Sequence, residues 1–348
     1  MSALLLAAAL AAALAAAPVR AEEPEPFGRA KTYGILILAY DVDVQWRQEL
    51  DGLPGKLKGH PVETVTSAAD SISVQRAIDR LVARRAAKIV AIPIETISDS
   101  TSLNMTRYMF GVRADPVLDV AAPSSGDLAD KRPPPIKPRV KSSLALPKDR
   151  DRDLPLPLGG DVSTEKRLSS PVPLVLAPAL DQSPMLVAIL ADRAKALSPM
   201  RTKETLVLAG IGPRDDAALK AWKTDAQAVA EAVGAKAGFR KATAVALRDF
   251  IGPAQLDKDR ADLRAAFRAL SREGRICVVP LSPEAGHVED MLKQYLDDFT
   301  PYRWNGKGIQ GDSRLVAWIK ASSEEAAKLP DGRQYKDAAP GARLGGLR

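Results

Sequence analysis

Two apolar stretches of the same design decide the fold: KIVAIPI at residues 88–94 and RICVVPL at residues 275–281. Each begins with a basic residue, continues through apolar residues, and ends in a proline followed by one more apolar residue. A short unbroken apolar run is typical of a strand buried on both faces, as in a parallel sheet. Residues 76–87 and 262–273, just ahead of the two stretches, have the pattern of amphipathic helices.

A second pair of apolar runs lies further upstream in each half of the chain. These are YGILILA at residues 33–39 and TLVLAG at residues 205–210, and each is followed by a polar turn and a helical stretch that contains a tryptophan, Trp46 or Trp222. Strand, helix, strand and helix then recur in the same order in both halves. This order predicts an α/β fold of two similar lobes, each a small parallel sheet flanked by helices with right-handed crossovers.

Composition divides the chain further. We assign residues 31–114 and 172–198 to lobe one, with a closing strand near 172–176, and residues 199–328 to lobe two. Residues 115–171 contain three consecutive prolines and the charged run KDRDRD, and such a segment buries too little apolar surface to offset its ordering entropy. We expect a disordered Pro-rich insertion there, with a docking ligand as the alternative, and a flexible tail over residues 329–348.

The N-terminus has the pattern of a secretory signal. Residues 4–17 contain only Leu and Ala, a run shorter than the ~20 residues that a membrane-spanning helix needs. Acidic residues and prolines follow at once, which predicts a signal peptide over residues 1–21 cleaved near Ala21. We expect a secreted or periplasmic protein with no stable membrane span after cleavage. An uncleaved anchor is the alternative.

Charge and cysteine content narrow the function classes. The 348 residues include 50 Lys and Arg against 43 Asp and Glu, but the two signs alternate along the expected helices, so no nucleic-acid partner is predicted. The single cysteine, Cys277, excludes an intramolecular disulfide and a CxxC metal site. It lies within an apolar strand pattern, which favours a buried, inert thiol.

Candidate chemistry is expected where ligands bind in parallel sheets, beyond the carboxyl ends of the strands. The segment SPEAGHVED at residues 282–290 follows one such end and places His287 among several carboxylates, including Glu289. The other histidine, His60, lies in a polar turn. The alternative for His287 and Glu289 is a plain helix start, with a carboxylate near the positive end of the helix dipole.

The order of these motifs resembles one family. An apolar strand, Pro, an apolar residue, a loop and His-x-Glu at a helix start are similar to the class II chelatases, the sirohydrochlorin cobaltochelatases (CbiX-type) and ferrochelatases, which have two similar lobes. The likeness extends through residues 178–198 and 302–319 and covers most of residues 31–322 outside the insertion. It implies insertion of a divalent metal, Co or Fe, into a tetrapyrrole such as sirohydrochlorin, the chemistry of cobalamin biosynthesis.

The resemblance also implies the site residues. His287 and Glu289 fall on the family's late His-x-Glu positions, as catalytic residues and metal ligands. The other family histidine follows a first strand as His-Gly, where this chain has Tyr40-Asp41 in lobe one and Ile211-Gly212 in lobe two. The lobe-one counterpart of His287 is close to Ser100. The expected cleft residues are therefore Tyr40, Asp41, Ser100, Ile211 and Gly212.

Three interpretations of the function stay open. The first is an exported chelatase, for which oxygen ligands from Asp41, Asp43 or Tyr40 would replace the missing histidine. The second is a non-catalytic protein of the same fold that binds a metal ion or a tetrapyrrole. The third is an interaction scaffold that uses the Pro-rich insertion.

Overall fold

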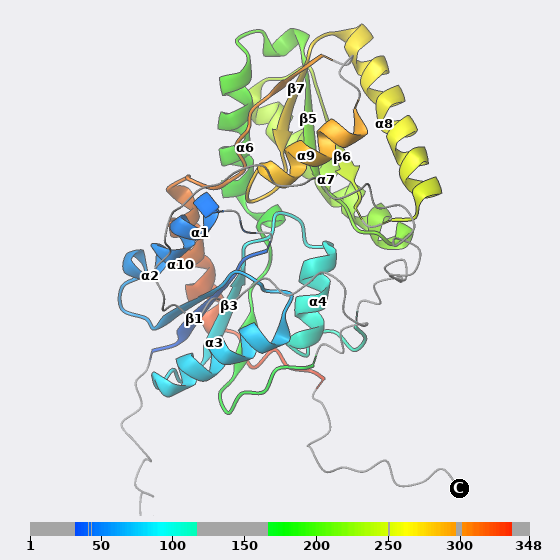
Figure 1. The fold of residues 1–348 in the computed structure, drawn as a ribbon. Helices are drawn as coiled ribbons and strands as arrows, with labels where there is room; N and C mark the ends of the chain where they lie inside the picture. The colour runs from blue at the N-terminus through cyan, green and yellow to red at the C-terminus, as the bar shows by residue number, and fades with distance from the viewer. Residues whose placement is uncertain are drawn as a thin grey trace, which may run out of the picture. The chain divides into compact units, whose positions relative to one another are not determined.

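The computed structural model describes residues 32–40, 42, 44–116, 166–249, 251–296 and 301–335. Figure 1 shows their arrangement as two groups of strands and helices. The predicted signal peptide, most of the Pro-rich insertion and the last 13 residues of the tail lie outside these ranges. No helix in the described ranges is long and apolar enough to cross a membrane.

The first sheet has four parallel strands in the order β2-β1-β3-β4. Its strands are β1 (Gly34–Leu38), β2 (Val62–Val65), β3 (Ile89–Pro93) and β4 (Leu174–Leu176). The helices in the same part of the chain are α1 (Val44–Asp51), α2 (Leu53–Lys56), α3 (Ser71–Ala83) and α4 (Thr101–Met109). The closing strand expected near 172–176 is confirmed as β4.

The second sheet repeats this arrangement in the order β6-β5-β7-β8, again all parallel. Its strands are β5 (Thr205–Ile211), β6 (Lys241–Leu247), β7 (Ile276–Pro280) and β8 (Tyr302–Trp304). The helices that follow in this part of the chain are α6 (Pro184–Leu197), α7 (Asp216–Ala237), α8 (Pro253–Glu273), α9 (Gly286–Tyr295) and α10 (Arg314–Ala327). The predicted α/β fold of two similar lobes, each with a small parallel sheet, is confirmed.

The shared proline ends the ladder in the same way in both sheets. Pro93 pairs with Leu38 of β1, and the next residue, Ile94, donates its N–H to the Leu38 carbonyl at 2.8 Å. The proline nitrogen therefore points to the other neighbour, β4, which pairs only with Ile89–Ala91 and does not extend so far. A proline has no N–H to donate, and none is needed here. Pro280 of β7 lies beyond β8 in the same way.

Both faces of each sheet are covered, which explains the unbroken apolar runs. In β1, Ile35 and Ile37 join a core cluster with Trp46, whereas Leu36 and Leu38 pack on the opposite face with α3. Successive side chains alternate between the two faces of a strand, so a strand between two helical layers needs apolar residues at every position. Cys277 of β7 is buried as predicted, and burial together with the nearby Glu204 carboxylate raises the pKa of its thiol to about 12.

Two helices pack differently from the sequence-based assignment to lobes. The helix expected to complete lobe one, α6, instead packs against α7 and β7 of the second sheet. Helix α10, expected in lobe two, packs against β3 and β4 of the first sheet (Figure 1). Lys88 holds the end of α10 by donating to the carbonyls of Ala327 and Leu329 at 2.7 Å each. Amphipathic patterns show that each helix needs a sheet to cover, but they do not specify which sheet.

Residues at the borders of the predicted insertion and tail make defined contacts with lobe one. Leu168 is buried in the first lobe's core, and its N–H donates to the Met109 carbonyl. Arg333 donates to the carbonyls of Ser170 and Val172 and pairs with Asp331 at 2.5 Å. These contacts hold residues 166–171, at the end of the predicted insertion, and residues 331–335, near the start of the predicted tail.

Candidate functional site

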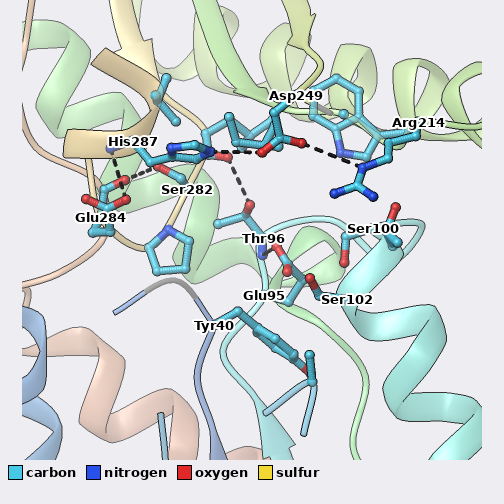
Figure 2. Close-up of a pocket in the computed structure, with 18 of the residues that line it drawn as sticks. Tyr40, Glu95, Thr96, Ser100, Ser102, Arg214, Asp249, Ser282, Glu284 and His287 are labelled. Carbon is cyan, nitrogen blue, oxygen red and sulfur yellow. Dashed lines mark hydrogen bonds and ion pairs between the residues drawn. The ribbon is translucent and has the colours of Figure 1, made fainter. Parts of the chain in front are cut away.

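A pocket of about 380 Å³ lies beyond the carboxyl ends of strands from both sheets. Tyr40 and Thr96, which follow β1 and β3, line it from lobe one, and Ile211, Asp249 and Ser282 line it from lobe two. Thr96 also joins the two lobes at this point, because its hydroxyl donates to the Leu281 carbonyl at 3.0 Å. Figure 2 shows the polar side chains of this pocket. Its position is the one expected for a ligand site in parallel sheets.

His287 enters the pocket from the first turn of α9. The loop after β7 contains the buried Glu284, whose carboxylate accepts the backbone N–H groups of Gly286 at 2.6 Å and His287 at 3.2 Å. These N–H groups lack a partner within the helix, and a carboxylate at a helix start is also favoured by the helix dipole. Glu284 therefore fixes the start of α9, and with it the backbone position of His287.

The imidazole of His287 contacts a carboxylate that follows β6, on the far side of β5 from β7 (Figure 2). Its Nε2 lies 3.3 Å from Oδ2 of Asp249, and the other oxygen of Asp249 lies 3.9 Å from Nε of Arg214. The side chain of His287 is 39% exposed and that of Asp249 is 24% exposed, so the pair is accessible from the pocket. A carboxylate bonded to one ring nitrogen sets the tautomer, which puts the lone pair on the other nitrogen.

Asp249 is held in place by its chain neighbour, Arg248, whose side chain is only 3% exposed. The guanidinium of Arg248 bonds both oxygens of Asp259, at 2.7 and 2.9 Å, and one oxygen of Asp216 at 2.6 Å. The phenol of Tyr295 accepts the N–H of Arg248 at 3.1 Å and donates to its carbonyl at 2.6 Å. Side chain and backbone are thus both fixed next to Asp249.

The pair of His287 and Asp249 also has the spacing of two ligands on one metal ion. Two atoms bound to a common ion at about 2.1 Å in tetrahedral geometry lie roughly 3.4 Å apart. A third protein ligand is missing: within the described ranges, no three His, Cys, Asp or Glu side chains gather closely enough to hold a metal ion.

Most of the sequence-predicted cleft residues meet at this pocket, namely Tyr40, Ser100, Ile211, Gly212 and His287. Asp41, like Asp43, lies outside the described residues.

The two hydroxyl candidates already have structural roles. The Tyr40 phenol bonds the Thr106 hydroxyl at 2.8 Å, and burial raises the pKa of Tyr40 far above its ordinary value, so the phenol stays protonated at neutral pH. The Ser100 hydroxyl accepts the N–H of Leu103 at the start of α4. Neither is poised to act as an oxyanion ligand.

Gly212 has a packing role. A Cβ at this position would lie 2.8 Å from the Cβ of Ala246, closer than real side chains come, so glycine lets the ends of β5 and β6 approach each other. The neighbouring Ile211 offers the pocket an apolar side chain that neither ligates nor carries protons.

Glu289 is not brought together with His287. Its carboxylate pairs with Lys293 at 2.7 Å and does not line the pocket. Hydrogen bonding to Lys293 lowers the pKa of Glu289 against the opposing effect of desolvation. The reason is helical geometry: residues two apart point about 200° away from each other, so His-x-Glu on a helix cannot aim both side chains at one site.

Sequence reasoning missed Asp249, the carboxylate that does contact His287. Its strand, β6, has the sequence KATAVAL, and its small and polar residues do not form the strong apolar run of the other strands. The available signal was the position of Arg-Asp directly after a short stretch of β-branched and small residues between two helices, because a carboxylate there falls at the end of a strand.

Of the comparisons with known proteins, only the comparison with solved structures found similar proteins. No family model matches the chain, and no curated protein matches it. Its fold is similar to that of SirB from Bacillus subtilis with Fe3+, with a TM-score of 0.47 and 11% sequence identity over 85% of this chain and 96% of that chain. It is also similar to the sirohydrochlorin chelatase SirB from Bacillus subtilis subspecies spizizenii in complex with cobalt, with a TM-score of 0.47 and 11% identity over 88% of this chain and 100% of that one.

Proposed function

We propose that this protein takes a divalent metal ion, Co or Fe, and a tetrapyrrole such as sirohydrochlorin as substrates, and inserts the metal into the ring. One observation carries the proposal: His287 and Asp249 lie 3.3 Å apart in a pocket that both lobes line. The sequence resemblance to class II chelatases points to the same reaction. Export of the chain after cleavage near Ala21 belongs to the proposal, and a mature chain that begins near residue 22 would support it.

The chemistry matches what these residues can do. When a divalent metal enters the ring, two pyrrole nitrogens each lose a proton, and the metal loses the ligands that delivered it. A neutral imidazole can accept one of these protons, and water in the exposed pocket can accept the other. The imidazole can also bind a metal and release it near neutral pH. Asp249 would orient the imidazole by bonding a protonated Nε2, and it would share a metal ion with Nε2 when that nitrogen carries no proton. Two protein ligands bind a metal less tightly than three or four, which suits a metal that must be handed over.

The first test is insertion of Co²⁺ into sirohydrochlorin under anaerobic conditions, followed by the change in the absorption spectrum. We expect wild-type protein to accelerate the change over the uncatalysed rate. Asp249→Asn keeps the size of the side chain but removes the charge next to His287, and we expect the rate to fall by about 10–100-fold. Asp257→Asn, on the exposed face of α8, serves as the control and leaves the rate unchanged. Equal rates with and without wild-type protein would refute the proposal.

A second candidate function is binding without turnover, and Ile211 favours it. This residue lines the pocket where the family resemblance places a second histidine. A protein of this kind would bind the metal or the tetrapyrrole with micromolar or better affinity in calorimetry, yet leave the insertion rate at the uncatalysed level.

Ile211→His separates the two candidates. If the missing imidazole is what prevents turnover, the variant should insert Co²⁺ at least about tenfold faster than wild type, because a positioned acid–base group contributes 10²–10⁴-fold. Ile211→Asn is the matched control, since it adds polarity at the same place without a titrating group. No gain from histidine over asparagine would show that position 211 does not limit the reaction.

A further inference from the structure

Among the residues that the structure describes, the second sheet ends in a long edge strand with no strand paired to its outer side. Strand β6 has seven residues, whereas the other three edge strands, β2, β4 and β8, have four, three and three. An edge strand presents unpaired N–H and C=O groups that can pair with another chain, and proteins protect such edges with charges, prolines or bulges. The sequence KATAVAL carries one charge, at its first residue, and no proline.

The direction of the outward groups follows from the ladder. The Leu247 carbonyl accepts from Gly212 at the end of β5, so Leu247 faces the sheet. Backbone groups of successive strand residues point to alternate sides. Ala242, Ala244 and Ala246 therefore direct their N–H and C=O groups away from β5, toward the open edge.

One side chain occupies this edge in the manner of a neighbouring strand. On α7, Gln227 donates from Nε2 to the Ala242 carbonyl at 3.3 Å and accepts the N–H of Ala244 on Oε1 at 3.0 Å. A residue of an added parallel strand would make the same pair of bonds, to the C=O of one residue and the N–H of the residue two positions later. The primary amide of Gln227 thus reproduces the hydrogen bonds that one residue of a fifth parallel strand would make.

The orientation of this amide is fixed by two further bonds. The Thr243 hydroxyl donates to Oε1 at 3.2 Å, and Nε2 donates to Glu231 at 2.9 Å. An amide with oxygen and nitrogen exchanged would lose the bond to the Ala244 N–H and would face Glu231 with an acceptor. Thr243 and Glu231 therefore hold Gln227 in the orientation that matches the strand edge.

We propose that Gln227 closes the edge of the second sheet and prevents β6 from pairing with β6 of a second copy of this chain. A second copy is the expected occupant because β6 itself consists of small, half-buried residues with a single charge. The groove around Gln227 is lined by equal numbers of basic and acidic side chains from α7, α8 and the end of β6, so two copies would meet there without net repulsion. This role is separate from the pocket chemistry and holds whether or not the protein inserts metals.

The first test uses the wild-type protein and amide hydrogen exchange at single-residue resolution. Ala244 and Ala246 both point outward, but only Ala244 donates to Gln227; for the Ala246 N–H no acceptor is found among the described residues. We expect the Ala244 amide to exchange at least about tenfold more slowly than that of Ala246. Equal rates would overturn the proposal.

The second test removes the amide. Gln227→Leu keeps the helix and the side-chain size, and we expect its average mass in sedimentation velocity to rise with concentration toward twice the wild-type value. The double variant Gln227→Leu with Ala244→Pro lacks the outward N–H and should return to the wild-type mass, because proline on an edge blocks strand addition. Gln227→Asn, which is one methylene too short, gives the same test if the leucine variant does not fold. A folded variant that keeps the wild-type mass at every concentration would contradict the proposal.

Discussion

Replacement of His287 by alanine is expected to slow Co²⁺ insertion into sirohydrochlorin by about 10²–10⁴-fold at neutral pH, the range that positioned acid–base groups contribute. The variant loses the only imidazole that lines the described pocket and removes the ring that bonds Oδ2 of Asp249. Folding should be little affected, since the His287 side chain is 39% exposed and changes at such positions usually alter stability by ~0.5 kcal/mol or less. The measurement is the initial rate of the absorption change, with unfolding followed in parallel.

His60→Ala is the matched control. The ring of His60 stacks on Tyr33 with centroids 4.1 Å apart, and its Nδ1 lies 3.2 Å from the Tyr33 carbonyl, so it serves the packing of lobe one. We expect no change in the insertion rate for this variant. Loss of activity in both variants to the same degree would point to damaged folding, and full activity in His287→Ala would remove the imidazole from the mechanism.

Replacement of Arg248 by methionine is expected to lower the free energy of unfolding by about 3–5 kcal/mol, the cost of breaking a buried ion pair. The Arg248 side chain is 3% exposed and that of Asp259 is 17% exposed, so the variant leaves a largely buried carboxylate without its cation. The carboxylate of Asp216 is 81% exposed, and the loss of that pairing should cost little because water solvates it. Urea unfolding followed by tryptophan fluorescence measures the difference.

The loss of stability in Arg248→Met should depend on pH. Desolvation raises the pKa of Asp259, but the hydrogen bonds from Arg248 and Gln255 outweigh it and lower the pKa below its ordinary value. A carboxyl with a lowered pKa stabilises the fold fully above its unfolded value, about 3.9, and loses that contribution as the pH falls through the folded value. The difference between wild type and Arg248→Met should therefore be largest at neutral pH and shrink below about pH 4.

Two further variants separate the contributions of Asp216 and Asp259 to this loss of stability. Asp216→Asn should change stability by ~0.5 kcal/mol or less. The double variant Arg248→Met with Asp259→Leu should recover much of the loss, because an apolar pair of similar size often replaces a buried ion pair without cost. A stability loss for Arg248→Met that is unchanged between pH 7 and pH 3.5 would show that the Asp259 charge is not its cause.

The sequence predicted the elements that depend on short-range patterns. The strands β1, β3, β5 and β7 were visible as apolar runs, because a strand covered on both faces needs apolar side chains at every position. The proline shared by β3 and β7 marked the last residue of each of these two strands. The sequence also predicted that His287 lies at a ligand site, because it follows the carboxyl end of a strand.

The partner of His287 could not be predicted in this way. Glu289 is its neighbour in the sequence, but the turn of α9 directs the Glu289 carboxylate to Lys293. Asp249 lies 38 positions earlier and contacts His287 because β6 and β7 both flank β5. A pattern along the chain cannot identify that contact.

The sequence by itself determined two parallel α/β sheets and the ends of strands where a site would lie, since these follow from alternation, apolar runs and chain order. Only the tertiary structure decided that α6 and α10 cover the sheets opposite to their expected lobes, that Asp249 faces His287, and that Gln227 closes the edge of β6. Those outcomes depend on strand order and on which surfaces fit each other, and a contact between distant residues leaves little trace in the local pattern of either.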